Sequence, residues 1–115
     1  MTIVVYGIPN CDTVKKARVW LQDRGIDFAF HDYKKAGIDP DTLSRWAQEA
    51  GWEKLLNKAG TTFRKLNDAD KTDLDEAKAI RLMVDNPSLI KRPVVEGAGP
   101  LLVGFKPEIY DAAFG

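Results

Sequence analysis

The chain has 115 residues, 44% of them hydrophobic and 30% charged. This is the commonest size of one globular domain, so we expect a single domain over residues 1–115 that is stable without metal or disulfide support. Lys and Arg together number 17, as do Asp and Glu, so the formal net charge is zero. A protein that binds nucleic acid over its whole surface usually has a basic excess, and we expect no nucleic-acid partner.

Targeting and membrane signals are also missing from the sequence. Its apolar runs of about five residues are far shorter than the ~20 that cross a bilayer. No basic segment followed by an apolar one begins the chain. We therefore expect a cytoplasmic protein without a membrane partner.

Cysteine and histidine are scarce. Cys11 and His31 occur once each, which excludes an internal disulfide, a Cys-x-x-Cys site and structural zinc. We expect no metal and no bound cofactor, so any chemistry depends on few groups.

The N-terminal third predicts a strand, a helix and a second strand. Residues 2–6 are β-branched and aromatic and precede a Gly-Ile-Pro-Asn turn. Apolar side chains recur at three- and four-residue steps over 12–24, which is typical of an amphipathic helix. Residues 26–33 alternate as in a strand, so this part favours a βαβ unit.

The middle of the chain predicts helices. Asp39-Pro40 is a capping residue followed by proline at the first helical position. We expect three helical pieces: residues 40–50, a short helix with an irregular basic stretch over 55–66, and a helix from Asp73 or Asp75 to Asn86.

The C-terminal part predicts a hairpin and a last helix. Residues 93–96 and 101–103 are separated by Gly-Ala-Gly-Pro, and the helix covers 107–114. The whole order is β-α-β, a helical block, then β-β-α. It indicates an α/β fold with a four-stranded mixed sheet and a helical insertion at approximately 38–88.

Cys11 is the main candidate for chemistry because it falls between a turn and a helix start. The first N–H groups of a helix and its dipole stabilise a thiolate at that place. Lys15 and Lys16 oppose the dipole there, which makes sense if the turn receives an anion. The alternative is a small buried filler, but the polar neighbours Asn10 and Thr13 favour a reactive thiol.

Basic residues near predicted element boundaries are further candidates. The planar guanidinium of Arg64 or Arg92 suits carboxylate, phosphate or arsenate, and Lys106 could add a third charge. The alternative for each is an ordinary solvated charge. A cis Arg92-Pro93 bond would expose backbone to a ligand, although only about 5–6% of X-Pro bonds are cis.

Several motifs together resemble one family. They are YGIPNCDTVKKA (6–17), GWEKLLN (51–57), TTFRKL (61–66), PSLIKRP (87–93) and VGF (103–105). They closely resemble the arsenate-reductase-related ArsC family, in its YffB branch near the Spx regulators, and the resemblance covers nearly the whole chain.

The resemblance implies a thioredoxin-like sheet with a helical insertion. It also implies that Cys11 is the catalytic thiol and that Arg64 and Arg92 match two arginines around that thiol in arsenate reductases. Pro93 would be the thioredoxin-like cis-proline.

Two positions depart from the arsenate reductases that the chain resembles. Lys106 stands where they have a third arginine, and it keeps the charge but loses the bidentate fork. Gly7 stands where they have a histidine, four residues before the cysteine. Both departures weaken the case for arsenate as the substrate.

The function that we expect is that of a glutathione-dependent thiol reductase. Cys11 attacks a disulfide sulfur, and glutathione, the co-substrate, resolves the mixed disulfide because the chain has no second cysteine. The expected substrate- and glutathione-binding residues are Asn10, Thr13, Lys15, Arg64, Arg92, Pro93 and Lys106.

Two other functions stay open. One is a glutathione-coupled arsenate reductase, whose oxyanion substrate would use the same residues. The other is an adaptor like the Spx regulators, which bind RNA polymerase; Val14 replaces the second cysteine of their redox switch. We further expect a monomer, with a glutaredoxin-like protein as a candidate partner.

Overall fold

The computed structural model describes residues 2–114. The chain divides into two compact units. Unit 1 combines both ends of the chain, up to Ala36 and from Arg92, and unit 2 consists of Gly37–Lys91.

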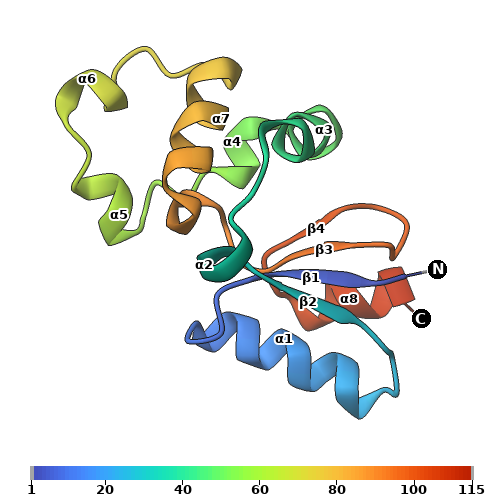
Figure 1. The fold of residues 1–115 in the computed structure, drawn as a ribbon. Coiled ribbons are helices and arrows are strands. Elements are labelled where there is room, and N and C mark those ends of the chain that lie inside the picture. Colours follow the sequence, from blue (N-terminus) through green and yellow to red (C-terminus); the bar gives the residue numbers. More distant parts are fainter. Residues whose placement is uncertain (1, 115) are drawn as a thin grey trace. The chain divides into compact units, whose positions relative to one another are not determined.

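Unit 1 is built on a four-stranded mixed sheet in the order β2-β1-β3-β4 (Figure 1). β1 pairs in parallel with β2 and antiparallel with β3, and β3 pairs antiparallel with β4. The predicted fold class is thereby confirmed. In chain order the elements of unit 1 are β1 (Val4–Gly7), α1 (Asp12–Asp23), β2 (Ala29–Asp32), α2 (Tyr33–Ala36), β3 (Val94–Glu96), β4 (Leu102–Val103) and α8 (Pro107–Phe114).

The second strand is shorter than its sequence pattern predicts. It covers Ala29–Asp32 rather than 26–33, and Tyr33 begins the short helix α2. The Asp32 side chain explains where the strand ends, because its Oδ1 accepts the N–H of Lys34 at 2.9 Å and turns the backbone out of the sheet.

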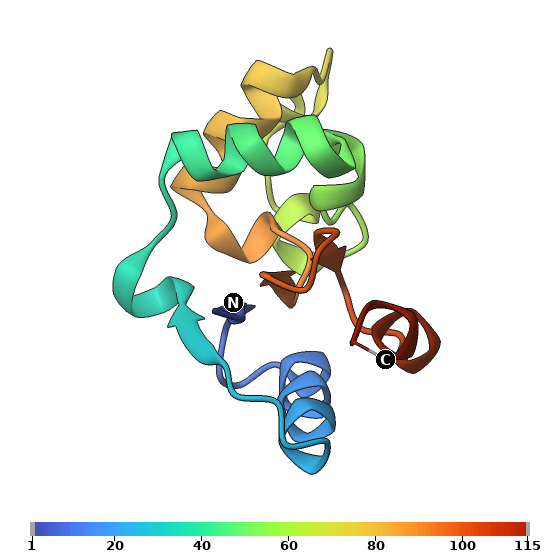
Figure 2. The same ribbon diagram turned by 90° about the vertical axis from the view of Figure 1, so that its right-hand side faces the viewer.

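The core of unit 1 lies between one face of the sheet and the helices α1 and α8 (Figures 1 and 2). The predicted apolar face of α1 is buried there, with Leu21 fully inaccessible and Trp20 8% exposed. Trp20 packs edge-to-face on Tyr110 of α8, with ring centroids 5.5 Å apart. Each fully buried side chain of this size contributes roughly 1.5–3 kcal/mol.

Unit 2 consists of short helices around its own buried residues. Asp39 caps its first helix as predicted, and Leu43 and Trp46 are buried on the inner face. Its helices are α3 (Pro40–Ala50), α4 (Trp52–Leu55), α5 (Thr61–Arg64), α6 (Asp68–Lys71), α7 (Glu76–Asp85) and a 3-10 helix at Pro87–Leu89.

The prediction of only three helical pieces in the middle of the chain was wrong. The stretch predicted over 55–66 contains the end of α4 and the whole of α5, with a break at Gly60. A further helix, α6, follows because the Asn67 side chain accepts the N–H of Asp70 at 2.8 Å.

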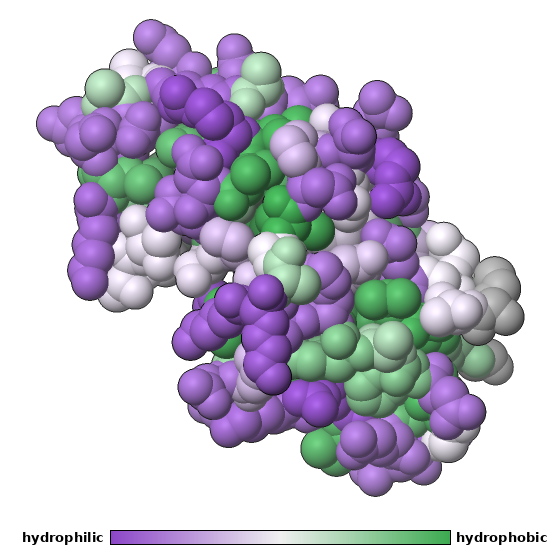
Figure 3. All heavy atoms as spheres, viewed as in Figure 1, coloured by the Kyte–Doolittle hydropathy of each residue, from purple (hydrophilic) through white to green (hydrophobic). Residues whose placement is uncertain are grey.

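The surface is mixed in character. On the face shown in Figure 3, hydrophilic side chains surround smaller hydrophobic areas. Within residues 2–114, no helix combines the length and the apolar composition that a membrane crossing requires.

Candidate active site

Cys11 occupies the N-cap position of α1. Its extended backbone (φ −85°, ψ 125°) ends the turn that follows β1, and its N–H donates to the Ile8 carbonyl at 3.2 Å. The first intrahelical bond runs from the Lys15 N–H to the Cys11 carbonyl at 3.0 Å. The thiol is partly exposed and therefore open to a small reactant.

The N–H groups at the start of α1 are left for another acceptor. An N-cap side chain usually accepts one of them, but Cys11 makes no such bond. Asp12, Thr13 and Val14 supply the N–H groups that lack an intrahelical acceptor. Together with the helix dipole they favour negative charge on the sulfur or on a group beside it.

The sheet register brings Arg92 and Pro93 to the end of the sheet where the Cys11 loop begins. Tyr6 pairs with Val94 in antiparallel strands, so the residues that precede Val94 lie beside those that follow Tyr6. The Arg92-Pro93 peptide bond is cis, and Pro93 is buried.

The loop that carries Lys106 starts at the same edge. Gly104 donates its N–H to the Pro93 carbonyl at 2.8 Å, and its own carbonyl accepts the Tyr110 hydroxyl at 2.9 Å. Burial raises the pKa of Tyr110 above its usual range, so this hydroxyl keeps its proton as a donor. Lys106 itself is exposed, at the start of α8.

Tyr33 is a residue at this edge that the sequence did not single out. Gly7 pairs with Asp32, which places Tyr33 near the start of the Cys11 loop. Its side chain is only 2% exposed, and its hydroxyl has no hydrogen-bond partner among residues 2–114. Burial is the main cause that raises the pKa of Tyr33, Tyr6 adds to it, and the charge of Arg92 opposes it. Only pairing the two parallel strands would have revealed this position.

The predicted site residues fall into two groups. Asn10, Thr13 and Lys15 are exposed around the N-terminal end of α1, in the same unit as Cys11. Arg92, Pro93 and Lys106 belong to that unit as well. Arg64 belongs to unit 2, where its carbonyl accepts the Lys71 ammonium at 2.8 Å. Its approach to Cys11 stays a prediction. Within residues 2–114, His, Cys, Asp and Glu form no group of three or more suited to a metal ion.

Comparison with known proteins identifies the family of the chain. The model of the ArsC family matches residues 6–113. The chain therefore belongs to the ArsC family. The solved structure of the YffB protein is 59% identical, with a TM-score of 0.95 over 98% of this chain and 99% of that one.

Two further similar proteins differ in their described roles. A solution structure of an arsenate reductase (ArsC) related protein from Brucella melitensis is 56% identical, covers 99% of this chain and 95% of that one, and has a TM-score of 0.77. The global transcriptional regulator Spx of Lactiplantibacillus plantarum is 29% identical over 105 residues, which are 90% of this chain and 79% of the regulator.

Proposed function

We propose that the protein is a glutathione-dependent thiol reductase. The observation that carries the proposal is a partly exposed thiol at a helix N-cap whose neighbouring N–H groups have no intrahelical acceptor. Membership of the ArsC family supports redox chemistry in general. Because Cys11 is the only cysteine, the second thiol of the reaction comes from outside the chain.

The reaction balances with glutathione as the reductant. The Cys11 thiolate attacks the glutathione sulfur of a mixed disulfide R–S–S–G, a Cys11–S–S–G bond forms, and RS⁻ leaves and takes up a proton. The thiolate of a second glutathione attacks the glutathione sulfur of this adduct. It releases oxidised glutathione and the Cys11 thiolate, so the sum is RSSG + GSH → RSH + GSSG.

The other residues of the site bind and orient the reactants. The free N–H groups over 12–14 favour negative charge at the sulfur. The buried Pro93 and its neighbour Arg92 immediately precede β3, and Arg92 can hold a glutathione carboxylate with two parallel bonds. Lys15, Lys106 and Arg64 supply further charge for carboxylates, and Asn10 and Thr13 line the turn.

Two substrates tested side by side separate this function from arsenate reduction. We expect purified protein to reduce a glutathione mixed disulfide and to show weak or undetectable arsenate reduction, because the single ammonium of Lys106 cannot hold an oxyanion through two parallel bonds. Arg92→Ala should lower kcat/KM for the disulfide about 10- to 150-fold, the equivalent of a lost charged hydrogen bond of roughly 1.5–3 kcal/mol.

Arg92→Lys is the matched variant for this assay. It keeps the charge and loses the fork, so an intermediate rate is expected if the bidentate geometry matters. Thermal unfolding of each variant separates loss of binding from loss of fold. Efficient arsenate turnover without disulfide reduction would reverse the ranking of the two enzymes.

A second candidate function rests on the similarity to Spx. A non-enzymatic adaptor of this type would bind RNA polymerase, and a pull-down with purified polymerase tests it. The adaptor becomes the better proposal if Cys11→Ser still binds polymerase and the wild-type protein reduces neither arsenate nor disulfides.

A further inference from the structure

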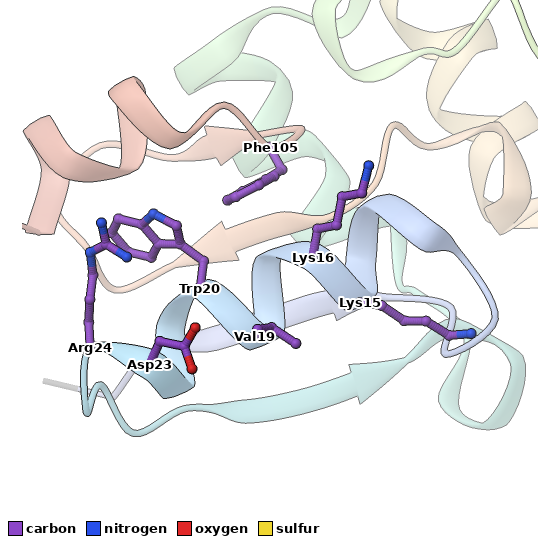
Figure 4. A pocket seen from close by; sticks show the side chains of 7 residues that line it. All are labelled: Lys15, Lys16, Val19, Trp20, Asp23, Arg24 and Phe105. Carbon is purple, nitrogen blue, oxygen red and sulfur yellow. The ribbon is translucent and has the colours of Figure 1, made fainter.

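A groove runs along the outer side of α1, between this helix and Phe105 (Figure 4). It has a volume of about 370 Å³. Val19, Trp20 and Phe105 make its lining largely apolar, and Val19 is 52% exposed, which is unusual for a large apolar side chain in this protein. An apolar hollow with an exposed apolar side chain suits the anchor residue of a ligand.

Two ammonium groups border the end of the groove that is nearest to Cys11. Lys15 and Lys16 line it, and Figure 4 shows Lys15 extending toward the N-terminal end of the helix. Neither lysine has an ion pair or a side-chain hydrogen bond within residues 2–114. Cations in the first turns of a helix are disfavoured by its dipole. Asp12 is the acidic residue of this first turn, but within residues 2–114 neither lysine forms an ion pair with it.

The charges at the far end of the groove are already balanced. Arg24 stacks on Trp20, 3.7 Å from the ring centroid, and forms an ion pair with Asp111 at 3.2 Å. Asp23 adds a carboxylate at this end. Among the residues that line the groove, the positive charges without an ion pair are therefore those of Lys15 and Lys16.

The groove continues onto the helix face that begins at Cys11. Positions 11, 15, 18 and 22 follow the i, i+4, i+7, i+11 spacing of one helix face. A smaller hollow of about 300 Å³ lies on this face, lined by Lys15, Arg18, Val19 and Gln22. The two hollows share Lys15 and Val19, so the cationic surface reaches the first turns of the helix that Cys11 caps.

We propose that this groove binds an acidic peptide segment with one apolar anchor, next to the cysteine of a protein substrate. The inference rests on the proposed function and names its substrate class: a glutathionylated protein with acidic residues beside the modified cysteine. In the reaction above, the peptide thiolate is the RS⁻ that leaves. A nucleic acid would supply phosphates but no aliphatic anchor for Val19 and Phe105.

Helix dimensions specify the peptide. At 1.5 Å per residue, Lys15 lies about 6 Å and Val19 about 12 Å along the helix axis from Cys11. An extended peptide advances about 3.3 Å per residue. Acidic side chains should therefore occur about two residues from the reacting cysteine, and the apolar anchor about four residues from it.

The test compares peptide–glutathione mixed disulfides made to this specification. Each peptide has glutamate two and three residues from the cysteine and leucine four residues from it. In one peptide these residues precede the cysteine, and in a second peptide they follow it. Matched peptides carry lysine in place of glutamate, or serine in place of leucine. We expect the acidic peptide thiol to be released about tenfold faster than the basic one at low salt, with the ratio falling as salt rises.

Variants of the protein locate the effect in the groove. Lys16→Glu and Val19→Ser should abolish the preference for the acidic peptide and leave the rate with a glutathione–mercaptoethanol disulfide within about twofold of wild type. Lys54→Glu, an equal charge change at an exposed site on unit 2, should preserve the preference. A preference that survives Lys16→Glu and Val19→Ser overturns the inference.

A binding measurement separates this inference from the proposed function. The labelled peptides carry serine in place of cysteine, and the protein is Cys11→Ser, so no disulfide chemistry can occur. Fluorescence anisotropy then measures binding alone. Tighter binding of the acidic peptide, lost in the double variant Cys11→Ser/Lys16→Glu, supports the groove even if no disulfide is reduced. Equal binding of the acidic and basic peptides overturns it, and reduction of the small disulfide alone would then leave the proposed function standing.

Discussion

At the scale of single residues, the contact between Gly7 and Val14 explains a departure from the arsenate reductases that the chain resembles. A Cβ at position 7 would lie 2.8 Å from Val14 Cγ2. Val14 is fully buried on the inner face of α1. A side chain as large as histidine therefore cannot occupy position 7 while Val14 keeps its place.

Gly7→Ala should lower the free energy of unfolding by roughly 1–3 kcal/mol, the usual cost of overpacking a tight interior site. Urea unfolding followed by circular dichroism measures the loss. Val14→Ala makes room for the new methyl group, so Gly7→Ala should cost less in that background than in wild type. Equal losses in both backgrounds would mean that the contact does not limit this position.

The sequence predicted that Cys11 lies at the start of a helix, but it did not single out the two buried tyrosines near the site. Its place between a turn and a helix start follows from local pattern. Tyr33 and Tyr110 become visible only once strand register and the fold of the C-terminal segment are known. The approach of Arg64 to the thiol depends on the placement of two units, which no local pattern encodes.

At the scale of elements, Asp39 determines where α3 begins. Its carboxylate accepts the Thr42 N–H at 2.7 Å and the Thr42 hydroxyl at 3.0 Å. The N–H bond is the main cause that lowers the pKa of Asp39, and the hydroxyl bond adds to it. A carboxylate whose pKa is lower in the folded state stabilises that state above the unfolded pKa, and this stabilisation disappears as the pH falls through the folded pKa.

Asp39→Ala should therefore lower the urea midpoint of unfolding at pH 7. The difference in midpoint between this variant and wild type should disappear below a pH of about 4. Urea titrations at several pH values test this. Asn67→Ala removes an uncharged cap from α6. Its difference in urea midpoint from wild type should therefore stay constant over the same pH range. A gap for Asp39→Ala that is equal at pH 7 and pH 3 would contradict the role of the carboxylate.

Elements with strong local signals were predicted better than those without. The helices over 12–23, 40–50 and 107–114 have apolar periodicity, caps or proline starts, and they occur where expected. The basic stretch over 55–66 has neither a long apolar stripe nor a strong cap. One short helix was predicted there, but the separation of α4 from α5 was not, and neither was α6, which begins at the Asn67 cap beyond this stretch.

At the scale of the whole molecule, the order of elements was the most informative signal. The succession β-α-β, helices, β-β-α predicted a mixed sheet, and the strand order β2-β1-β3-β4 agrees with it. The resemblance to the ArsC family then supplied the thioredoxin-like assignment. Pattern alone could not decide between the functions that such a fold supports.

The whole chain has one thiol, so its oxidation by glutathione should stop at one adduct. Intact mass after treatment with oxidised glutathione should show a single added glutathione, because no second cysteine can expel it from within. Reduced glutathione should remove it. Cys11→Ser provides the control and should gain no mass. Absence of the adduct from wild-type protein with an alkylatable Cys11 would favour the adaptor function.

The division of unit 1 between the two ends of the chain affects how the protein emerges from the ribosome. β1 and the Cys11 loop are made before unit 2, but β3, which pairs with β1, follows only after it. At roughly 5–20 residues per second this delay lasts several seconds. Unit 2 is continuous in sequence and can begin folding from its own residues. Arg92 and Pro93, in contrast, are synthesised long after Cys11. During synthesis, the candidate active site therefore assembles only after unit 2 has been made.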